Sequence, residues 1–245
     1  MATDKKVALV TGANRGIGFE TARQLGQKGV TVVVAARTLK SAEETAAKLK
    51  TEDVDAFPLK LDVTNTQDRE AAARTLGDKF GKLDILINNA GVGAQDGMFN
   101  KTINTTEEEL QTVFGTNLFA TIAVTRSLLP LLKKSDAGRI VNLSSILGSL
   151  ALHADPNSPI ASVKTFAYDA SKTALNAFTI HLAAELKDTK IKVNSAHPGW
   201  VKTDMGTDAA PMEIPEGAKT SVDLALLGPD GPNGRFIHLG QELPW

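Results

Sequence analysis

The sequence contains no cysteine, and it has a single tyrosine and two tryptophans among its 245 residues. Without cysteine the chain cannot form a disulfide framework, a thiolate zinc site, a thiolate-ligated iron-sulfur cluster or a cysteine nucleophile. This absence is consistent with a reducing compartment. The four histidines, His153, His181, His197 and His238, show no metal-ligand spacing. We therefore expect no metal site, and we expect a structural role for His197.

An excess of one charge sign and a long apolar run are also absent. Lysine and arginine number 27 against 28 acidic residues, a net charge of -1 that gives no electrostatic reason to expect a nucleic-acid partner. No apolar run approaches the roughly 20 residues of a membrane span. The apolar run that follows the first residues is too short for a secretory signal. We expect a cytoplasmic protein without a membrane partner.

Short apolar, β-branched runs alternate with stretches of helical periodicity. Strands are predicted at Val7–Val10, Val30–Ala36, Val54–Leu61, Leu83–Ile87, Arg139–Leu143, Ile191–Ala196 and Arg235–Leu239. Helices are predicted at Gly16–Gln27, Ser41–Lys50, Gln67–Phe80, Glu107–Lys133, Tyr168–Lys187 and Glu216–Leu226. Strands that are apolar on both faces and separated by helical crossovers predict a parallel sheet covered on both sides. The expected fold is therefore α/β, a doubly wound, Rossmann-type parallel sheet of seven strands.

No linker, charge block or internal repeat marks a domain boundary, so residues 1–245 are expected to form one domain. Two turn-rich segments, Asp155–Pro159 and Thr207–Pro215, are predicted to be loops. Loops that project from a rigid sheet often determine specificity.

A glycine-rich turn connects the first predicted strand to the first predicted helix. Gly12 permits a tight turn, Gly16 lets the backbone approach a pyrophosphate, and Gly18 allows close packing of the helix. The start of the helix would direct free N–H groups at phosphate. A purely structural turn is the alternative, and the preceding apolar strand and following helix argue against it.

The spacing of this turn, G-x-x-x-G-x-G after a threonine, resembles that of the short-chain dehydrogenases/reductases. Further motifs of the family follow the later predicted strands in order: Asn88-Asn89-Ala90-Gly91, Asn117, Ser144-Ser145, Tyr168-Asp169-Ala170-Ser171-Lys172 and Pro198-Gly199-Trp200-Val201-Lys202-Thr203. The resemblance covers nearly the whole chain and is nearest to the carbonyl reductase branch. It implies a cofactor half at about residues 1–145 and a substrate and catalytic half at about residues 146–245.

The resemblance implies a nicotinamide cofactor, and the residues after the second strand favour NADPH. An acidic residue there would bind the ribose 2′-hydroxyl of NAD, but Arg37 stands at this point without a carboxylate. Arg15 in the glycine-rich turn would face the same 2′-phosphate. Solvated surface charges are the alternative for both arginines. The cofactor contacts implied by the family are Gly12, Asn14, Arg15, Gly16, Ile17, Gly18, Arg37, Asp62, Val63, Asn89, Ala90, Gly91, Tyr168, Lys172, Pro198, Gly199, Val201 and Thr203.

Two positions among these contacts have structural alternatives. Asp62 and Val63 would hold the adenine, whereas Asp62 could instead cap the helix that follows. Asn89 to Gly91 resemble the segment that runs along the adenosine ribose, and Asn88 could join neighbouring strands.

Tyr168 and Lys172 are four residues apart in a predicted helix and therefore lie on one face. A phenol with a pKa of about 10 is a poor acid or base at neutral pH, and a nearby ammonium stabilises its charged form. The resemblance makes Tyr168 the proton donor, Ser145 the hydroxyl that holds the substrate oxygen, and Asn117 part of a proton relay. Ser144 is the rival to Ser145, which has the family's spacing to Gly148.

The turn at Pro198–Thr203 resembles the one beneath the nicotinamide, and Asp204–Pro215 is expected to form a lid. The predicted substrate contacts are Val92, Ser145, Leu147, Tyr168, Trp200 and Met205. The interval from Ser145 to Tyr168 is longer than is common in the family because of an insertion at Leu150–Phe166. The family implies a homo-oligomer, a dimer or tetramer, whereas this insertion leaves a monomer open.

These features predict NADPH-dependent reduction of a small ketone or aldehyde to an alcohol. One alternative is an NADP-dependent alcohol or sugar dehydrogenase that works in the oxidative direction. Another is a non-catalytic sensor that binds the dinucleotide on the same fold. An epimerase of the extended family would need a longer C-terminal substrate region.

Overall fold

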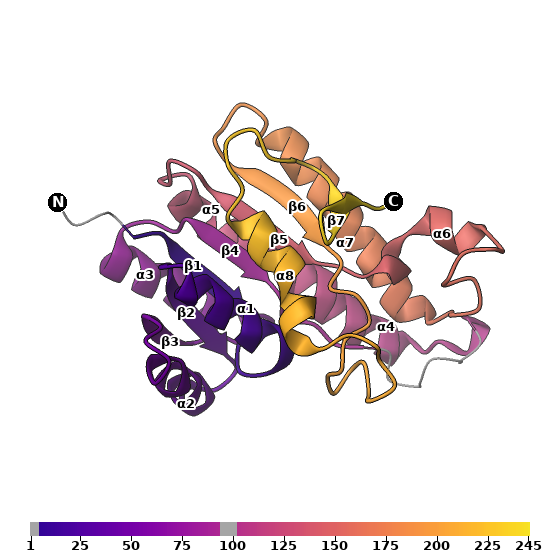
Figure 1. Cartoon of the computed structure of the whole chain (residues 1–245), viewed down its shortest axis with the longest axis horizontal. Coiled ribbons are helices and arrows are strands. Elements are labelled where there is room, and N and C mark those ends of the chain that lie inside the picture. The colour runs from indigo at the N-terminus through magenta and orange to yellow at the C-terminus, as the bar shows by residue number, and fades with distance from the viewer. Residues whose placement is uncertain (1–4, 94–101) are drawn as a thin grey trace.

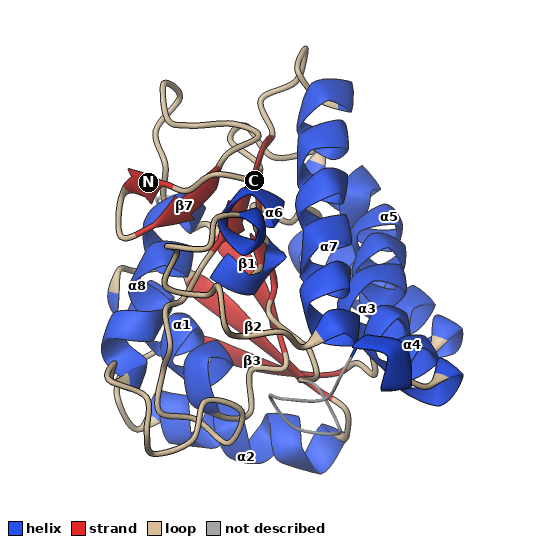
Figure 2. Cartoon of the chain, turned by 90° about the vertical axis from the view of Figure 1, so that its right-hand side faces the viewer, coloured by secondary structure: helices blue, strands red, loops and turns tan. Residues whose placement is uncertain are grey.

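The computed structural model describes residues 5–93 and 102–245, and its elements form three layers (Figures 1 and 2). A central sheet has α1, α2 and α8 on one face and α3, α5 and α7 on the other. The strand order is β3-β2-β1-β4-β5-β6-β7-β8. This is the doubly wound α/β arrangement predicted from the sequence.

The first seven strands pair in parallel and match the predicted runs to within two residues at either end. Their bounds are β1 Val7–Thr11, β2 Thr31–Ala36, β3 Ala56–Lys60, β4 Ile85–Asn88, β5 Arg139–Leu143, β6 Lys192–Ala196 and β7 Phe236–His238. An eighth strand, β8 at Gln241–Glu242, pairs antiparallel with β7. The sheet therefore has one more strand than the seven predicted. Leu239 and Gly240 form the connecting turn with φ of 45° and 81°, and a leucine is a weak turn signal.

Helices fill the crossovers between the parallel strands. Their bounds are α1 Gly16–Gln27, α2 Leu39–Lys50, α3 Thr66–Phe80, α4 Glu107–Phe114, α5 Thr121–Leu132, α6 Leu150–Ala154, α7 Phe166–Glu185 and α8 Ile214–Ala225. The sequence analysis predicted no helix at α6, which lies in the insertion. Within the described residues, no helix is long and apolar enough to cross a membrane.

Alternate residues of strands β1 to β6 enter two separate cores. Val7 and Leu9 of β1 pack with residues of α3, α5 and α7, such as Leu128. Ala8 and Val10 face the other way, into a core shared with α1, α2 and α8. Because both faces are buried, the strands are continuous apolar runs, which is the pattern that identified them in the sequence.

The helix predicted at Glu107–Lys133 is interrupted by a π-helical turn. The turn spans Gly115–Ala120 and lies between α4 and α5. A π-turn adds a residue to the helical repeat and is frequent at functional sites. Here it contains Asn117, whose side chain is buried.

The strand order reverses between β1 and β4, the neighbouring strands from which the chain moves to opposite edges of the sheet. In doubly wound sheets, ligands bind at the carboxyl ends of the strands on either side of such a point. The glycine-rich turn follows β1, and Asn89–Gly91 follows β4. The fold therefore places these two motifs side by side.

The segment Leu150–Phe166 packs against the C-terminal residues of the chain. Its short helix α6 lies beside the last residues, where the Ala151 amide donates a hydrogen bond of 2.9 Å to the Trp245 carbonyl. The Trp245 ring stacks on Phe236 of β7 with 5.7 Å between ring centroids. Figure 1 shows α6 on the same side of the molecule as the C-terminus. Residues 243–245 thus connect the insertion to the sheet.

Candidate functional site

The glycine-rich turn adopts the backbone conformation that its glycines permit. Gly12 and Gly16 have φ of 62° and 55°, in the left-handed region that favours glycine. A Cβ atom at Gly12 would lie 3.1 Å from the Cα of Ala90. At Gly18 it would collide with the Asn89 side chain and the Gly12 carbonyl. The tight packing at Gly18 is therefore against the turn and the Asn89 side chain.

Thr11 and Asn89 hold this turn against the segment after β4. The Thr11 hydroxyl accepts hydrogen bonds of 3.0 Å from the amides of both Asn89 and Ala90. The Asn89 side-chain amide donates to the carbonyls of Thr11 and Gly12, at 2.8 and 3.1 Å. The sequence analysis predicted that Asn89 lies along the ribose, but it did not predict these hydrogen bonds. The threonine before the first glycine was the sequence feature that could have indicated them.

The start of α1 offers free donors for an anion. Its N-cap residue, Arg15, makes no side-chain hydrogen bond to the helix, so the first N–H groups keep their donor capacity. A Cβ at Gly16 would meet only Thr203, at 3.6 Å. Asn14, Arg15 and Gly16 line a groove of about 510 Å³ that extends to α2 and the start of α8. This arrangement fits a dinucleotide phosphate.

The two arginines expected at the 2′-phosphate are both exposed. Arg37 lies directly after β2. Arg15 forms an ion pair of 2.6 Å with Asp204, a residue of the expected lid. The predicted lid thus contacts the glycine-rich turn through a charge pair.

Asp62 does not cap the helix that follows it. Its carboxylate accepts hydrogen bonds from the amide and hydroxyl of Thr64, at 2.9 and 2.7 Å. Asn65 is the N-cap of α3, since its side chain accepts from the Asp68 amide. Val63, at the same turn, is buried. The alternative role considered for Asp62 is therefore wrong, and a contact with adenine remains a prediction.

Ser145, Tyr168 and Lys172 come together where β5 ends and α7 begins. The Ser145 hydroxyl lies close enough to the Tyr168 phenol to lower the pKa of that phenol. The Lys172 ammonium lies 5.5 Å from the centre of the Tyr168 ring and donates a 2.8 Å hydrogen bond to the Leu143 carbonyl. It also lies 3.7 Å from where a Cβ of Gly91 would be. A phenol, a hydroxyl and an amine therefore meet beside the segment that contacts the glycine-rich turn.

Of the two adjacent serines, only Ser145 points into this cluster. Its hydroxyl also accepts a 3.2 Å hydrogen bond from the Leu147 amide. The hydroxyl of Ser144 is buried without a hydrogen-bond partner among the described residues. The geometry therefore favours Ser145 as the functional hydroxyl.

Burial shifts the pKa values of both titratable groups in this cluster. Burial raises the pKa of Tyr168 to about 12, with a smaller lowering by the nearby Ser145 hydroxyl and a smaller rise from the Asp169 charge. Burial lowers the pKa of Lys172 to about 8. The sequence spacing suggested that Lys172 would lower the pKa of the phenol. In the structure the largest effect on the pKa of the phenol is instead its own desolvation, and desolvation also acts on the amine.

Asn117 connects the π-turn to α7 and to the segment after β4. Its side chain accepts from the Val92 amide at 2.8 Å and donates to the Val92 carbonyl at 3.0 Å. It also donates to the Ser171 hydroxyl at 3.0 Å, and Ser171 donates to the Tyr168 carbonyl at 2.7 Å. Asn117 therefore links the backbone at Val92 to the backbone at Tyr168 through Ser171.

The turn after β6 forms another wall of the site. Val201 is buried and pairs with Met212 in an isolated parallel bridge. Pro198 and Gly199 precede it, and Gly199 has a φ of 90°. The Thr203 hydroxyl accepts a 3.1 Å hydrogen bond from the Gly206 amide. The lid segment thus begins with a fixed turn.

The apolar residues predicted to contact substrate differ in their exposure. Trp200 and Met205 are large and exposed, and the Trp200 indole donates to the Gly206 carbonyl at 2.8 Å. Met205 packs on Gly93, where an added Cβ would lie 3.3 Å from its Cγ. Val92 and Leu147 are half-buried. Trp200 and Met205 therefore remain available for a ligand.

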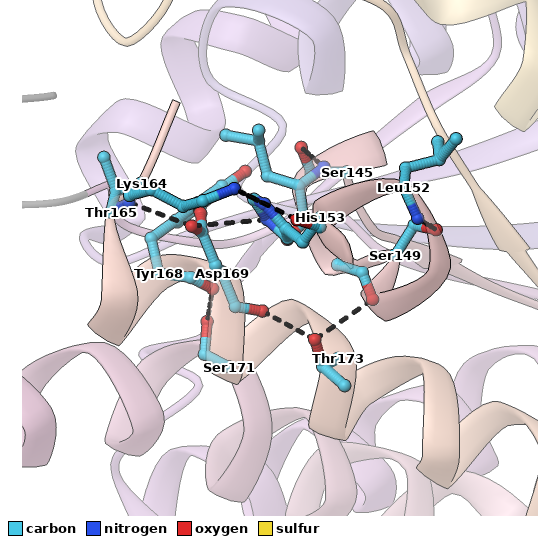
Figure 3. Close-up of polar contacts among 12 residues, drawn as sticks. Ser145, Ser149, Leu152, His153, Lys164, Thr165, Tyr168, Asp169, Ser171 and Thr173 are labelled. Carbon is cyan, nitrogen blue, oxygen red and sulfur yellow. Dashed lines mark hydrogen bonds and ion pairs between the residues drawn. The ribbon is translucent and has the colours of Figure 1, made fainter. Parts of the chain in front are cut away.

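The insertion contacts the start of α7 through a polar cluster (Figure 3). His153 of α6 lies between Lys164 and Asp169, with its Nδ1 3.0 Å from the Lys164 ammonium and its Nε2 3.4 Å from the Asp169 carboxylate. Asp169 accepts hydrogen bonds from the amide and hydroxyl of Thr165, at 2.9 and 2.6 Å. Burial raises the pKa of Asp169. The insertion is thereby attached to the residue next to Tyr168.

Asn88 has a structural role beside the site, and the histidines do not form a metal-binding cluster with other described residues. Asn88 donates to Asn142 at 2.8 Å and to Thr125 at 3.0 Å, joining β4 to β5 and α5, which is the strand-joining role that the sequence left open. Among residues 5–93 and 102–245, no cluster of three or more metal-binding side chains is found.

A family model described as short chain dehydrogenase matches residues 6–214. The (-)-isopiperitenone reductase of Mentha piperita is 33% identical, with 97% of each chain covered. Carbonyl reductase [NADPH] 1 of Mus musculus is also 33% identical, with 100% of both chains covered. These similarities extend over the whole length of the chain.

Solved structures agree with the sequence comparison. An NADPH-bound carbonyl reductase from chicken fatty liver superposes with a TM-score of 0.86 at 29% identity, covering 98% of this chain and 99% of that one. Salutaridine reductase from Papaver somniferum gives a TM-score of 0.81 at 31% identity, covering 95% and 99%. Fold, motifs and relatives therefore agree that this chain belongs to the short chain dehydrogenase family of oxidoreductases.

Proposed function

We propose that the protein reduces a small ketone or aldehyde to the alcohol with NADPH as the reductant. The observation that carries this proposal is the meeting of Ser145, Tyr168 and Lys172 beside Gly91. The named activities of the similar proteins from mouse and peppermint support the same reaction class. When bound, the reduced nicotinamide would supply a hydride to the carbonyl carbon.

Tyr168 would give its phenolic proton to the carbonyl oxygen as that oxygen gains negative charge. With a pKa of about 12 the phenol keeps its proton at neutral pH, as a general acid must. Ser145 would donate a hydrogen bond to the same oxygen and hold the carbonyl in place. The Lys172 ammonium would stabilise the phenolate that remains.

The choice of NADPH over NADH rests on the charges around the glycine-rich turn. Arg15 lines the groove next to α1, and Arg37 follows β2. A guanidinium can bind a phosphate through two hydrogen bonds. An acidic residue after β2, which would bind the ribose hydroxyls of NADH, is missing from Ala35–Thr38. The NADPH named for two similar carbonyl reductases agrees with this choice.

A panel of ketones and aldehydes, followed by the loss of NADPH absorbance, tests this function. We expect turnover of at least one class of carbonyl with NADPH and much slower turnover with NADH. The same panel of alcohols with NADP tests the oxidative alternative. Calorimetric titration with NADPH separates an enzyme from a sensor, because a sensor would bind the cofactor without turnover in either direction. A protein that does not bind NADPH contradicts the proposal.

A further inference from the structure

His197 lies outside the group of residues that would contact substrate or cofactor, yet it joins two loops that carry such residues. It is the residue before Pro198 and is 7% exposed. Its Nδ1 accepts a 3.2 Å hydrogen bond from the Ile146 amide and a 3.4 Å hydrogen bond from the Gly199 amide. Ile146 follows Ser145 directly. One ring nitrogen therefore accepts hydrogen bonds both from the residue after Ser145 and from the turn after β6.

The remaining contacts of His197 fix the position of its ring. Its own amide donates to the Ile237 carbonyl at 2.8 Å, and its carbonyl lies 2.9 Å from the Nδ1 of His238. The two imidazole rings are 4.7 Å apart. The backbone of His197 is thus held by β7 while its side chain reaches toward Ile146.

Both hydrogen bonds require that Nδ1 carries no proton, because an N–H donor needs a lone pair to point at. Burial, with a smaller effect from His238, lowers the pKa of His197 to about 3. The ring therefore stays neutral, with its proton on Nε2, through the range in which the enzyme would work. Pro198 has no N–H group, so the Gly199 amide is the first donor in the turn that Nδ1 can reach.

We propose that His197 is a positioning residue that sets the location of the Ser145 hydroxyl relative to the turn at Pro198–Thr203. The inference rests on the proposed function, because it assigns the serine to the carbonyl oxygen and the turn to the nicotinamide. Ser145 precedes a three-residue 3₁₀ turn, Ile146–Gly148, whose first amide is the one bound by His197. Movement of that amide would move the serine on which the carbonyl depends.

Two substitutions at His197 distinguish the effect of losing the hydrogen-bond acceptor from the effect of replacing the ring. His197→Asn places an acceptor oxygen where Nδ1 was, whereas His197→Leu keeps comparable size without an acceptor. We expect His197→Leu to lower kcat about 10- to 100-fold, in line with the cost of a small misplacement of a reacting group. His197→Asn should restore most of that loss, and NADPH affinity should change little in either variant. Equal losses in both variants overturn the proposal.

A double-mutant cycle with Ser145→Ala distinguishes positioning from a general effect on folding. In the Ser145→Ala background, His197→Leu should lower kcat by no more than about threefold, because the group it positions is gone. If His197→Leu has the same factor in both backgrounds, the histidine does not act through the serine.

The same hydrogen bond can be removed from its other end. Ile146→Pro deletes the donor N–H, and Ser145 has φ of -151° and ψ of 150°, an extended conformation that a following proline accepts. Ile146→Ala is the matched control, since it loses the side chain but keeps the N–H. We expect the proline variant to be slower than the alanine variant, and to add little to His197→Leu. Equal rates for the proline and alanine variants contradict the proposal, even if His197→Leu fails to fold.

Two readouts do not depend on turnover. Exchange of the Ile146 amide hydrogen should be slow in the wild type and in His197→Asn, and faster in His197→Leu. The ¹⁵N spectrum of the ring should show an unprotonated Nδ1 down to pH 5. A protonated Nδ1 at neutral pH overturns the inference. If the wild type turns over no carbonyl but these readouts hold, it is the proposed function that fails.

Discussion

Arg15 in the glycine-rich turn and Asp204 in the segment after Thr203 form an ion pair of 2.6 Å, although both side chains are largely exposed. The pair connects the start of α1 to the expected lid. In the proposed function Arg15 must bind the 2′-phosphate of NADPH, so Asp204 competes with the cofactor for the same guanidinium.

Removing that competitor should strengthen cofactor binding slightly. For Asp204→Asn we expect the dissociation constant of NADPH to fall by up to about fivefold at low salt, because exposed ion pairs contribute about 0.2–1 kcal/mol. The gain should shrink as salt screens the charges. Calorimetry measures it, with Asp208→Asn as a matched change of charge in the same loop. A gain that persists in an Arg15→Ala background would contradict the role of Arg15.

Reversing the charge after β2 should alter the choice of cofactor. Arg37→Asp removes a cation from the expected 2′-phosphate and supplies an acceptor for ribose hydroxyls. We expect the ratio of kcat/KM for NADPH over NADH to fall by at least about tenfold, since a charge-assisted hydrogen bond is worth about 1.5–3 kcal/mol. Lys187→Asp, an exposed change of the same charge beyond α7, is the control. An unchanged ratio for Arg37→Asp would refute the assignment.

Loss of the phenol should stop turnover without releasing the cofactor. Tyr168→Phe keeps the ring but removes the proton donor, and general acid catalysis is worth about 10² to 10⁴ in rate. We expect a decrease in kcat of that size, with the dissociation constant of NADPH within a few-fold of the wild type. Steady-state kinetics and calorimetry check the two parts separately. Near-normal reduction by this variant would remove Tyr168 from the mechanism.

The alkaline limit of activity should belong to the amine and not to the phenol. The pKa of Lys172 is lowered to about 8 by burial, whereas the pKa of Tyr168 is about 12. Because kcat/KM reports groups of the free enzyme, kcat/KM for NADPH should fall as the pH rises above about 8. In Lys172→Arg the fall should move to higher pH, since a guanidinium stays charged. If the alkaline fall in kcat/KM occurs at the same pH in Lys172→Arg as in the wild type, Lys172 is not its origin.

Stability at mildly acid pH should depend on His197. Its pKa is about 3 in the folded protein and about 6.5 when unfolded, so between these values only the unfolded state takes up this proton. Unfolding free energy should therefore fall with the pH below about 6.5, by about 2 kcal/mol from this group between pH 7 and pH 5. Denaturant unfolding of His197→Asn should lack this contribution. His181→Asn, at an exposed position on α7, should behave like the wild type.

Much of the fold could be predicted because the strands are buried on both faces and therefore stand out as apolar runs. The features that were missed carry weaker signals in the sequence. The turn before β8 contains Leu239, which is not a usual turn residue, at a positive φ, and α6 lies where the distant residues Trp245 and Asp169 contact the insertion. The π-turn at Gly115–Ala120 is only six residues long, which is too short a segment for apolar periodicity to distinguish a π-turn from an α-helical turn.

For the candidate site, the sequence predicted which groups would come together but not their surroundings. The four-residue spacing of Tyr168 and Lys172 predicted that both side chains lie on one face of α7. Their pKa values depend on how deeply the cluster is buried, which spacing does not determine. The links made by His197 and Asn89 join positions far apart in the chain, and only the folded structure brings their partners within hydrogen-bond distance.

Because Tyr168 is the only tyrosine in the chain, every phenolate signal that the protein gives comes from the proposed proton donor. An ultraviolet difference titration of the unaltered protein would therefore follow the ionisation of that one group, without isotopic labels or substitutions. Chemical nitration would likewise mark a single position, so that the colour of the product reports directly on the environment where the reaction is proposed to occur.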